Sequence, residues 1–561
     1  MEKELHVQNT LRRILTLLKL ERAEISAVYF YAILNGLIQL SLPLGVQAII
    51  GLVLGASIST SLVVLIALVV VGVLFSGIMQ VNQMKIIEKI QQKLFVRYSF
   101  QFINQLHVLD LKRNDNLYLP ELMNRFFDIP VLQKSLSKIL LDIPAASIQV
   151  LFGLLLLSFY HPVFIVFGLV LITLLVLILR YTGQQALQSS IQESNFKFRT
   201  AGWLQETARA INSIKLAKNN DIHVRRLDVE VSSYLDARNT HFKTLLFQYN
   251  VLVIFKTIIT AAMLIVGTYL MLDQKLTVGQ FIAAEIVIIM VLNSVEKLIA
   301  NLATVYDTVT AKEKIASVTE KPVEKNGNLK LPHSDDGLKL QLQKVGFSYN
   351  DRDSILSDIS FSINPNETVC VRGADSSGKT TLLKLLAGAY PDFSGVYLLN
   401  NVPLGNYDLI SLRANTGLLL DEQEIFHGTL WENITLDNQS ISTDTLVGYA
   451  IKTGLSEFVE TLPKGYDTLL DPTGRRLPRS VVTKILLVRA LANEPRLLLL
   501  EDPWQYCTNE QRGAIIKILL ERKNATVVVF TNDEQFAQQC DKIIVLGNNG
   551  TISSITQNTK G

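Results

Sequence analysis

The sequence is poor in cysteine and in net charge, and one long stretch near its start has no charged residue. Only three cysteines occur among 561 residues, at Cys370, Cys507 and Cys540. Their spacing matches no metal-binding motif, and so few cysteines suit a reduced cytosolic domain better than a disulfide-bonded secreted one. The formal net charge is only +3, so the whole-chain charge gives no reason to expect nucleic acid as a partner.

The stretch without charged residues runs from Ile25 to Met84. It is long enough for two helices of about 20 residues, each crossing a hydrocarbon core of about 30 Å. Four more apolar stretches follow, so we predict an integral, multi-pass membrane protein with six spans. The predicted spans are Ile25–Leu54, Ser61–Gln83, Leu140–Phe159, Val163–Tyr181, Val251–Leu272 and Val278–Leu298.

The segments that join these spans differ in length and charge. Three are very short, whereas Lys85–Lys138 and Thr182–Asn250 are long and charged. Lysine and arginine accumulate on the cytoplasmic side, so we predict that both long segments and both chain ends are cytoplasmic. Their helical periodicity predicts extensions of the membrane helices, with short transverse helices at Leu119–Phe127 and Phe196–Glu206.

The residues before the first span, 1–24, predict an amphipathic helix. One face gathers Leu11, Ile14, Leu15 and Leu18, while Arg12, Arg13 and Lys19 lie on another. Such a helix either lies in the membrane interface as an entry elbow or is an ordinary solvated amphipathic helix.

A nine-residue stretch in the second half of the chain matches the phosphate-binding loop G-x-x-x-x-G-K-T. It reads Gly373-Ala374-Asp375-Ser376-Ser377-Gly378-Lys379-Thr380-Thr381. The glycines let backbone N–H groups surround a triphosphate, Lys379 reaches the β and γ phosphates, and the Thr380 hydroxyl holds Mg²⁺. An apolar strand precedes the loop and a helix follows it, so we predict a site for ATP and Mg²⁺.

The residues after the spans predict a separate domain. A polar linker at residues 319–337 contains Pro322 and Pro332 and ends the membrane domain of residues 25–318. Beyond it, in residues 338–561, buried-type strands such as Leu497–Leu500 and Val527–Phe530 alternate with helices. This alternation predicts an α/β domain with a largely parallel sheet.

Six spans with long cytoplasmic helices, followed by such a P-loop domain, resemble half of an ABC exporter. The resemblance covers nearly the whole chain and implies a multidomain membrane protein: a six-helix transmembrane domain of the type I exporter fold followed by an α/β P-loop ABC ATPase domain. It further implies an ATP-driven translocase that exports a substrate across the bacterial inner membrane. The membrane part is most similar to bacterial type I secretion and peptide exporters, although we expect no processing peptidase before the spans.

The same resemblance implies dimers, because ABC exporters bind two ATP molecules between facing nucleotide domains. The expected partner is a second half-transporter, with a heterodimer favoured and a homodimer possible, and a periplasmic adaptor is a possible further partner. The exported substrate is not predicted.

Five residues at family positions carry the rest of the proposed site. Tyr349 resembles the aromatic residue that stacks on adenine, although a tyrosine that ends a strand can also be part of the core. Asp421 stands where the family has a glutamine that bridges Mg²⁺. The pair Glu501-Asp502 replaces the family's aspartate and catalytic glutamate, which shortens the expected base by one methylene. Asn532 replaces the switch histidine.

The signature loop of the family, L-S-G-G-Q, aligns with Leu477-Pro478-Arg479-Ser480-Val481. Pro478 has no N–H to donate, and two larger residues stand where glycines permit close approach. We therefore expect a degenerate site with weak hydrolysis. Two alternatives stay open: a non-transporting pseudo-ATPase that regulates a partner, and an active homodimeric exporter whose altered residues compensate one another.

Glu285 is the residue that this scheme leaves unexplained. It lies inside the sixth predicted span, where a charge is costly and often functional. It either lines a path for a substrate or a proton, or is a structural group that pairs with Lys256 or faces a wet cavity.

The predicted orientation can be tested by cysteine labelling. A cysteine at Ser57, in a short external loop, should react with a membrane-impermeant maleimide added to intact cells. A cysteine at Asp115, in the first long charged segment, should react only after the cells are opened. The reverse pattern of labelling would overturn the orientation.

Overall fold

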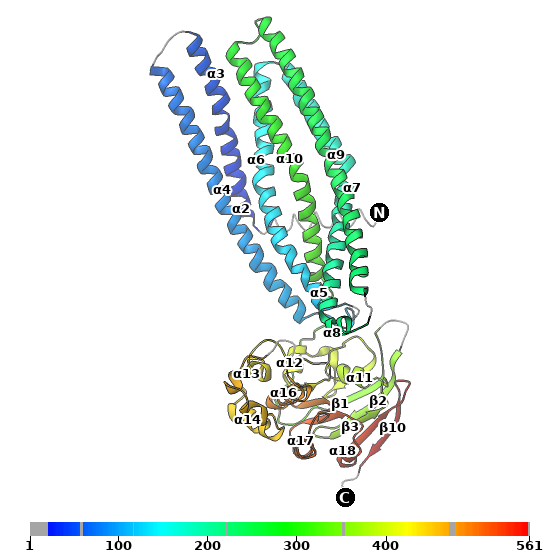
Figure 1. The fold of residues 1–561 in the computed structure, drawn as a ribbon. Helices are drawn as coiled ribbons and strands as arrows, with labels where there is room; N and C mark the ends of the chain where they lie inside the picture. The colour runs from blue at the N-terminus through cyan, green and yellow to red at the C-terminus, as the bar shows by residue number, and fades with distance from the viewer. Residues whose placement is uncertain are drawn as a thin grey trace. The chain divides into compact units, whose positions relative to one another are not determined.

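The computed structural model describes residue 19 and residues 21–55, 60–115, 117–218, 221–349, 354–470 and 477–558. The chain forms two compact units (Figure 1). The first comprises the described part of Met1–His107 together with Leu117–Lys321, and the second comprises Val108–Asn116 together with Pro322–Gly561. The apolar face predicted at Leu11–Leu18 lies outside the described residues.

The first unit forms helices and no strand in its described residues, and it confirms the prediction of six spans. Six helical stretches in the described residues are long and apolar enough to cross a membrane. They are α2 with α3 (Arg22–Gln39 and Ser41–Leu54), α4 (Thr60–His107), α5 to α6 (Leu119–Met123 and Asp128–Tyr160), α7 (Val163–Arg209), α9 (Ile222–Leu272) and α10 (Val278–Thr319). Several of these helices continue far beyond the predicted spans, as their periodicity had indicated.

The two predicted transverse helices have different outcomes. Leu119–Phe127 does form short separate pieces, α5 and the 3₁₀ helix η1 (Asn124–Phe127), with a proline in the first turn of α5. The prediction at Phe196–Glu206 is wrong, because α7 passes through it and the short helix α8 follows at Ile211–Lys215. That stretch has no proline, and its one glycine is tolerated inside a long helix.

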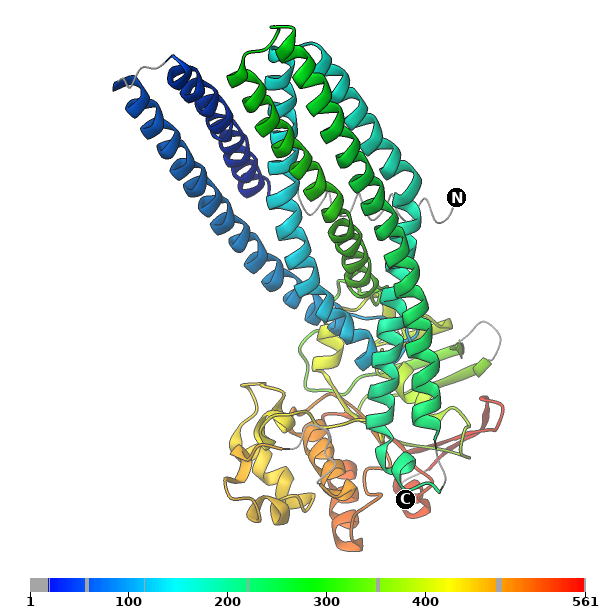
Figure 2. The same cartoon turned by 45° about the horizontal axis from the view of Figure 1, so that its top comes forward.

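Close helix packing holds the first unit together, most of all between α6 and α10. Figures 1 and 2 show these helices side by side, and α7 likewise beside α9. A Cβ atom at Gly153 of α6 would lie 2.5 Å from Cγ2 of Val291 in α10. Glycine therefore sets the distance between the helices, as small residues commonly do in membranes. The Ser294 hydroxyl of α10 also donates to Oε1 of Gln149 in α6 at 2.7 Å.

The second unit contains two sheets that differ in strand direction. The six-stranded sheet has the order β10-β9-β3-β8-β7-β6, in which only β10 is antiparallel to its neighbour, as the sequence predicted. Its strands are β3 (Thr368–Gly373), β6 (Thr416–Leu419), β7 (Leu497–Glu501), β8 (Thr526–Phe530), β9 (Lys542–Leu546) and β10 (Ile552–Gln557). An antiparallel sheet is formed by β1 (Leu340–Ser348), β2 (Ser354–Ile363), β4 (Ser394–Leu399) and β5 (Val402–Pro403).

The middle of the parallel sheet is the core of this unit. Every residue of β8 and the first four residues of β7 are buried, which explains their unbroken apolar runs. Helices cover the sheet; those with a role below are α11 (Lys379–Leu386), α16 (Arg479–Ala492), α17 (Asn509–Glu521) and α18 (Glu534–Gln539). The unit also contains α12 (Leu409–Ala414), α13 (Leu430–Thr435), α14 (Thr443–Lys452) and α15 (Ser456–Glu460).

The short segment Val108–Asn116 belongs to the second unit although it lies between two helices of the first. Leu109 forms an antiparallel β-bridge with Val323. Lys112 donates to the carbonyl oxygen of Asp392 at 2.7 Å, and its Nζ lies 5.0 Å from the centre of the Phe347 ring. Backbone pairing and a cation–π contact thus tie this segment to the linker and to β1.

The packing of α6 against α10 can be tested at Gly153. Gly153→Leu should lower the free energy of unfolding by about 1–3 kcal/mol, because the new side chain meets Val291 and forces the helices apart. Gly77→Leu in α4 is the matched control, since no atom lies within 4 Å of its added Cβ. Thermal unfolding of both variants in detergent would measure the difference. Equal melting temperatures for the two variants would contradict the packing described here.

Candidate nucleotide-binding site

The phosphate loop connects the end of β3 to the start of α11, so the predicted strand–loop–helix arrangement is observed. Gly378 has a φ of +90°, in the left-handed region that favours glycine. A Cβ at Gly373 would lie 2.5 Å from Oγ of Ser377. Each of the two motif glycines therefore has its own reason to be glycine, one conformational and one steric.

Lys379 lies folded over this loop. Its ammonium group donates to the carbonyl oxygens of Gly373 and Ala374, at 2.6 and 2.9 Å. The Ser377 side chain is only 2% exposed, and its hydroxyl has no hydrogen-bond partner among the described residues. A buried, unpartnered donor just before the N-cap of a helix, in a loop bound by a lysine ammonium, is the environment that a phosphate group requires.

Glu501, at the end of β7, connects two of the predicted metal-site residues. Its Oε1 accepts a hydrogen bond from the Thr380 hydroxyl at 2.5 Å, and its Oε2 accepts one from the backbone N–H of Asp421 at 3.1 Å. A hydroxyl and a carboxylate side by side are hard oxygen ligands of the kind that Mg²⁺ prefers.

Asp502 follows Glu501 in a sharp turn. It has a φ of +39°, and its backbone N–H donates to the carbonyl oxygen of Phe530 in β8 at 3.0 Å. Burial raises the pKa of Asp502, and a hydrogen bond with Thr531 partly opposes this. A carboxyl group that binds its proton more tightly is a better proton acceptor once it is ionised.

Asn532, just beyond β8, is bound to the first glycine of the phosphate loop. Its Oδ1 accepts from the Gly373 N–H at 3.2 Å, and its Nδ2 donates to the Gly373 carbonyl oxygen at 3.1 Å. Both polar atoms of the Asn532 amide thus bind the backbone of Gly373. These two hydrogen bonds hold the end of β8 against the loop.

Tyr349 lies just after β1 and is half-buried in a group of aromatic rings. Its ring is 5.0 Å from that of Phe347 in an edge-to-face arrangement. Its hydroxyl is 3.2 Å from Oγ1 of Thr381 and 3.3 Å from the hydroxyl of Tyr390. The tyrosine is therefore both part of a packed cluster and joined directly to the phosphate loop.

The stretch Leu477–Val481 leads into α16. Pro478 is the N-cap residue, and α16 begins at Arg479, which forms an ion pair with Oδ1 of Asp421 at 3.2 Å. Leu477 and Val481 pack against the apolar core beneath. Because Asp421 also binds Glu501 through its N–H, an unbroken chain of polar contacts runs from Thr380 to Arg479.

Two neighbours of the site, Tyr390 and Lys112, are not indicated by the sequence. Tyr390 stacks on Phe347 with ring centres 4.8 Å apart, and Lys112 lies over that same ring. The tyrosine after α11 offers no motif, and Lys112 is more than two hundred residues away in sequence. No pattern in the sequence could have placed either of them here.

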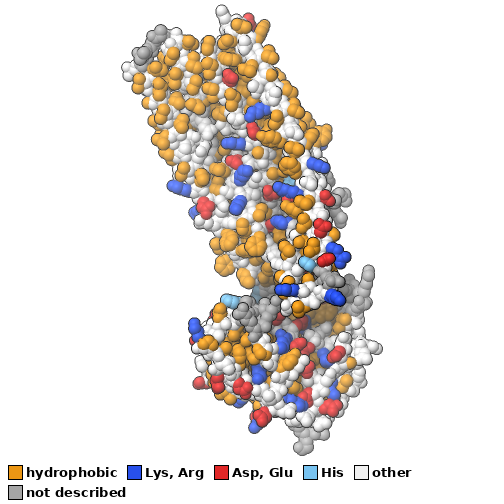
Figure 3. All heavy atoms as spheres, in the orientation of Figure 1, with side chains coloured by type: hydrophobic (Ala, Val, Ile, Leu, Met, Phe, Trp, Pro, Cys, Tyr) orange, Lys and Arg blue, Asp and Glu red, His pale blue; other side chains and the backbone are white. Residues whose placement is uncertain are grey.

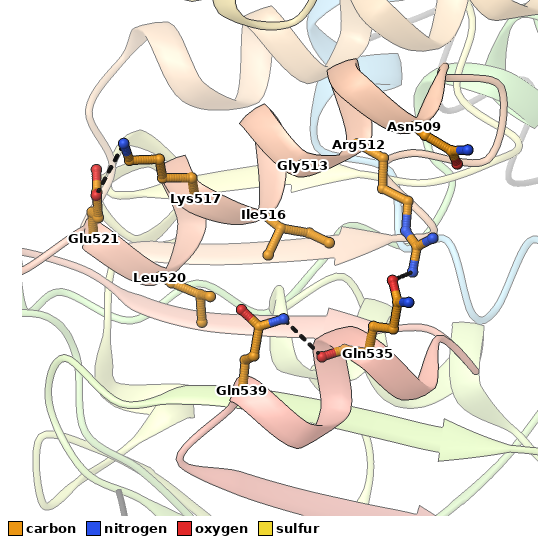
Figure 4. Close-up of a pocket in the computed structure, with 9 residues that line it drawn as sticks. All are labelled: Asn509, Arg512, Gly513, Ile516, Lys517, Leu520, Glu521, Gln535 and Gln539. Carbon is orange, nitrogen blue, oxygen red and sulfur yellow. Dashed lines mark hydrogen bonds and ion pairs between the residues drawn. The ribbon is translucent and has the colours of Figure 1, made fainter.

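A separate cavity of about 520 Å³ lies between α17 and α18 (Figure 4). Arg512 crosses it to Oε1 of Gln535 at 3.0 Å, and Gln539 donates to the backbone carbonyl of Gln535 at 3.0 Å. Its side chains thus bind one another, and none of the predicted site residues lines it.

Two family models match the chain. The ABC transporter transmembrane region matches residues 25–295, and the ABC transporter domain matches residues 356–505. The chain belongs to the ABC transporter family. With its membrane and ATP-binding domains fused in one chain, it is a half-size ABC exporter, as the resemblance implied.

Relatives of known name agree with this assignment. The chain is 27% identical to the alpha-hemolysin translocation ATP-binding protein HlyB of Escherichia coli O157:H7, over 63% of this chain and 50% of that protein. It is 24% identical to the lactococcin-A transport/processing ATP-binding protein LcnC of Lactococcus lactis, over 83% of this chain and 65% of that protein. The chain thus spans half to two thirds of the length of these relatives.

A solved structure of a bacterial Atm1-family ABC exporter with ATP bound has the same fold. The TM-score is 0.82 at 17% sequence identity, and the alignment covers 96% of this chain and 95% of the other. The six-helix membrane unit and the α/β nucleotide unit thus have the fold of that exporter.

Proposed function

We propose that this chain is the ATP-binding subunit of an exporter that moves a substrate out across the bacterial inner membrane. The observation that carries the proposal is the phosphate loop, in which Lys379 and the unpartnered Ser377 hydroxyl surround the space for a phosphate. Both chain ends and the nucleotide unit are cytoplasmic, since lysine and arginine accumulate in the long segments between spans.

The bound nucleotide is Mg-ATP. The residues present fit it, because Gly373–Thr381 forms a cradle that a Cβ would fill and Thr380 with Glu501 offers oxygen ligands for Mg²⁺. Asp421 is a further candidate ligand of Mg²⁺, and Tyr349 is the residue that stacks on the adenine. The metal ion would neutralise charge on the phosphates, while the chain's own groups orient the nucleotide.

Hydrolysis by this chain alone is slow. The base, Asp502, is one methylene shorter than the family's glutamate, and a small displacement of a base is costly. Asn532 is uncharged, and both ends of its amide are bound to Gly373. At the signature stretch, Pro478 has no N–H to donate and Arg479 is paired with Asp421 in the same chain.

The working unit is a dimer. A second half-transporter with an intact signature is the favoured partner, because this chain carries both an altered base and an altered signature and cannot complete a site by itself. The other assemblies to be examined are a homodimer and a dimer with a periplasmic adaptor bound. Purification from the native membrane, followed by identification of the proteins that accompany the chain, distinguishes these assemblies.

Lys379→Ala tests nucleotide binding. The variant should bind Mg-ATP at least about thirtyfold more weakly, because it loses the cation that reaches the β and γ phosphates. Lys384→Ala is the matched control on the same helix, since Lys384 pairs with Glu422 rather than with the loop. Titration of the purified chain with a fluorescent ATP analogue measures both. If the unmodified chain binds no ATP, the proposed function is wrong.

The double variant Asp502→Glu, Asn532→His tests which alteration limits hydrolysis. In the chain alone, ATP turnover should rise by less than about threefold, because residues that act as a unit give non-additive effects and the signature is unchanged. With a partner that has an intact signature, the same variant should gain about tenfold or more. ATP turnover is measured by phosphate release. The background is measured with versions of the same proteins that also carry Lys379→Ala.

A tenfold gain in the chain alone, with Pro478 and Arg479 untouched, would mean that the altered signature works. The active homodimeric exporter would then be the correct description. Tight nucleotide binding with no turnover in any pairing would instead favour a pseudo-ATPase that regulates its partner.

A further inference from the structure

One interpretation of the sequence was an ion pair between Lys256 of the fifth span and Glu285 of the sixth. Lys256 of α9 does not pair with Glu285. Its Nζ lies 2.9 Å from Oε2 of Glu296 in α10 and 3.4 Å from Oδ1 of Asn293. Tyr249 of α9 also donates to Oε1 of Glu296, at 3.2 Å. Both oxygens of Glu296, and the ammonium of Lys256, are therefore satisfied.

Helix geometry explains why Lys256 cannot serve both carboxylates. Glu285 and Glu296 are eleven residues apart on α10, which places them roughly 20° apart around the helix but roughly 16 Å apart along it. They thus lie on one stripe of α10, and only Glu296, which is farther from the start of the helix, is in reach of Lys256. The Glu285 carboxylate has no ion pair or hydrogen bond to any residue in the part of the chain that the structure describes.

The stripe with Glu285 lies at the edge of the packed face of α10. Val287 is completely buried against the neighbouring helices, and Leu292, on the stripe between the two glutamates, is only 2% exposed, whereas Ile289, one turn from Glu285, is 51% exposed. Figure 3 shows a few charged side chains among hydrophobic ones over the helices of the first unit. In the single chain the stripe is therefore closed at Leu292 and open beside Glu285, at Ile289.

The depth of Glu285 makes an open face in contact with lipid costly. It follows the start of α10 at Val278 by seven residues, or roughly 10 Å of helix, so it lies well inside a hydrocarbon core of about 30 Å. Charged side chains at such depth almost always face the interior of a bundle or a water-filled cavity, and they pair with an opposite charge. Glu285 has the position of such a residue but lacks the opposite charge.

We propose that Glu285 lines a water-filled part of the export path and that the missing opposite charge is supplied by the substrate. The substrate class is then a hydrophilic molecule with a primary ammonium or guanidinium group. This inference rests on the proposed function as an exporter. It commits to a cation because no lysine or arginine among the described residues pairs with Glu285. Lys256 of the neighbouring span is already bound to Glu296, which leaves Glu285 as the unneutralised charge on the stripe.

The experiment measures water and charge beside Glu285. A single reactive cysteine is placed at Ile289 in the full chain, reconstituted in lipid nanodiscs, with the half-buried Cys507 changed to alanine. The probes are two methanethiosulfonates of similar size, the cationic ethyltrimethylammonium and the anionic ethylsulfonate compound. The rate at which each probe modifies the protein is divided by the rate at which the same probe modifies a small free thiol.

Both probes should modify the cysteine at Ile289, and the cationic probe should be preferred by about tenfold or more, because a carboxylate raises the local concentration of cations. Glu285→Gln should reduce this preference to that of the free thiol. A cysteine at Val70 in α4 is the matched control, since Val70 is 62% exposed but lies in the stretch without charged residues, and neither probe should reach it through lipid.

Failure of both probes to modify the Ile289 position would mean that lipid, or a second protein chain, covers the stripe, and the inference would be wrong. A preference that is absent, or that persists in Glu285→Gln, would also overturn it. Mg-ATP binding is measured on the same samples. Loss of binding there concerns the proposed function, whereas normal binding without cation preference rejects only the substrate class.

Discussion

The candidate nucleotide site depends on one constraint, which is that neighbouring parallel strands end at the same edge of their sheet. β3 is followed by the phosphate loop, β7 ends at Glu501, and Asn532 lies just beyond β8. Their order in the sheet brings three segments that are far apart in sequence within hydrogen-bond distance. The buried apolar strands supply the rigidity, and the polar residues after them supply the chemistry.

This constraint also explains why so much could be predicted from sequence. A strand with an unbroken apolar run and a phosphate loop each leave a local signature. The strands β7 and β8 were therefore predicted with nearly correct ends, and β3 and α11 were predicted as the strand and helix beside the loop. The six spans were recognised for a similar reason, because a helix in lipid must be apolar over a fixed length. Where a local signature decides the structure, the sequence was sufficient.

The relations between distant segments could not be predicted in this way. Nothing in the sequence indicated that Arg479 pairs with Asp421, or that Lys256 chooses Glu296 rather than Glu285. Both outcomes depend on which faces of two elements meet, and that is fixed by packing. The unbroken helix through Phe196–Glu206 is a related case: periodicity showed a helix there but could not show whether it turned.

The assignment of Val108–Asn116 to the nucleotide unit has a practical consequence. The chain passes between the two units three times, after His107, after Asn116 and after Lys321, so the second unit is not one continuous piece of sequence. A recombinant nucleotide domain that starts at the linker would lose the strand partner of Val323 and the cation over Phe347. The aromatic group that includes Tyr349 would be left with an uncovered edge. Biochemistry on such a fragment would therefore describe a domain with an artificial surface beside Tyr349, and the intact chain is the better material.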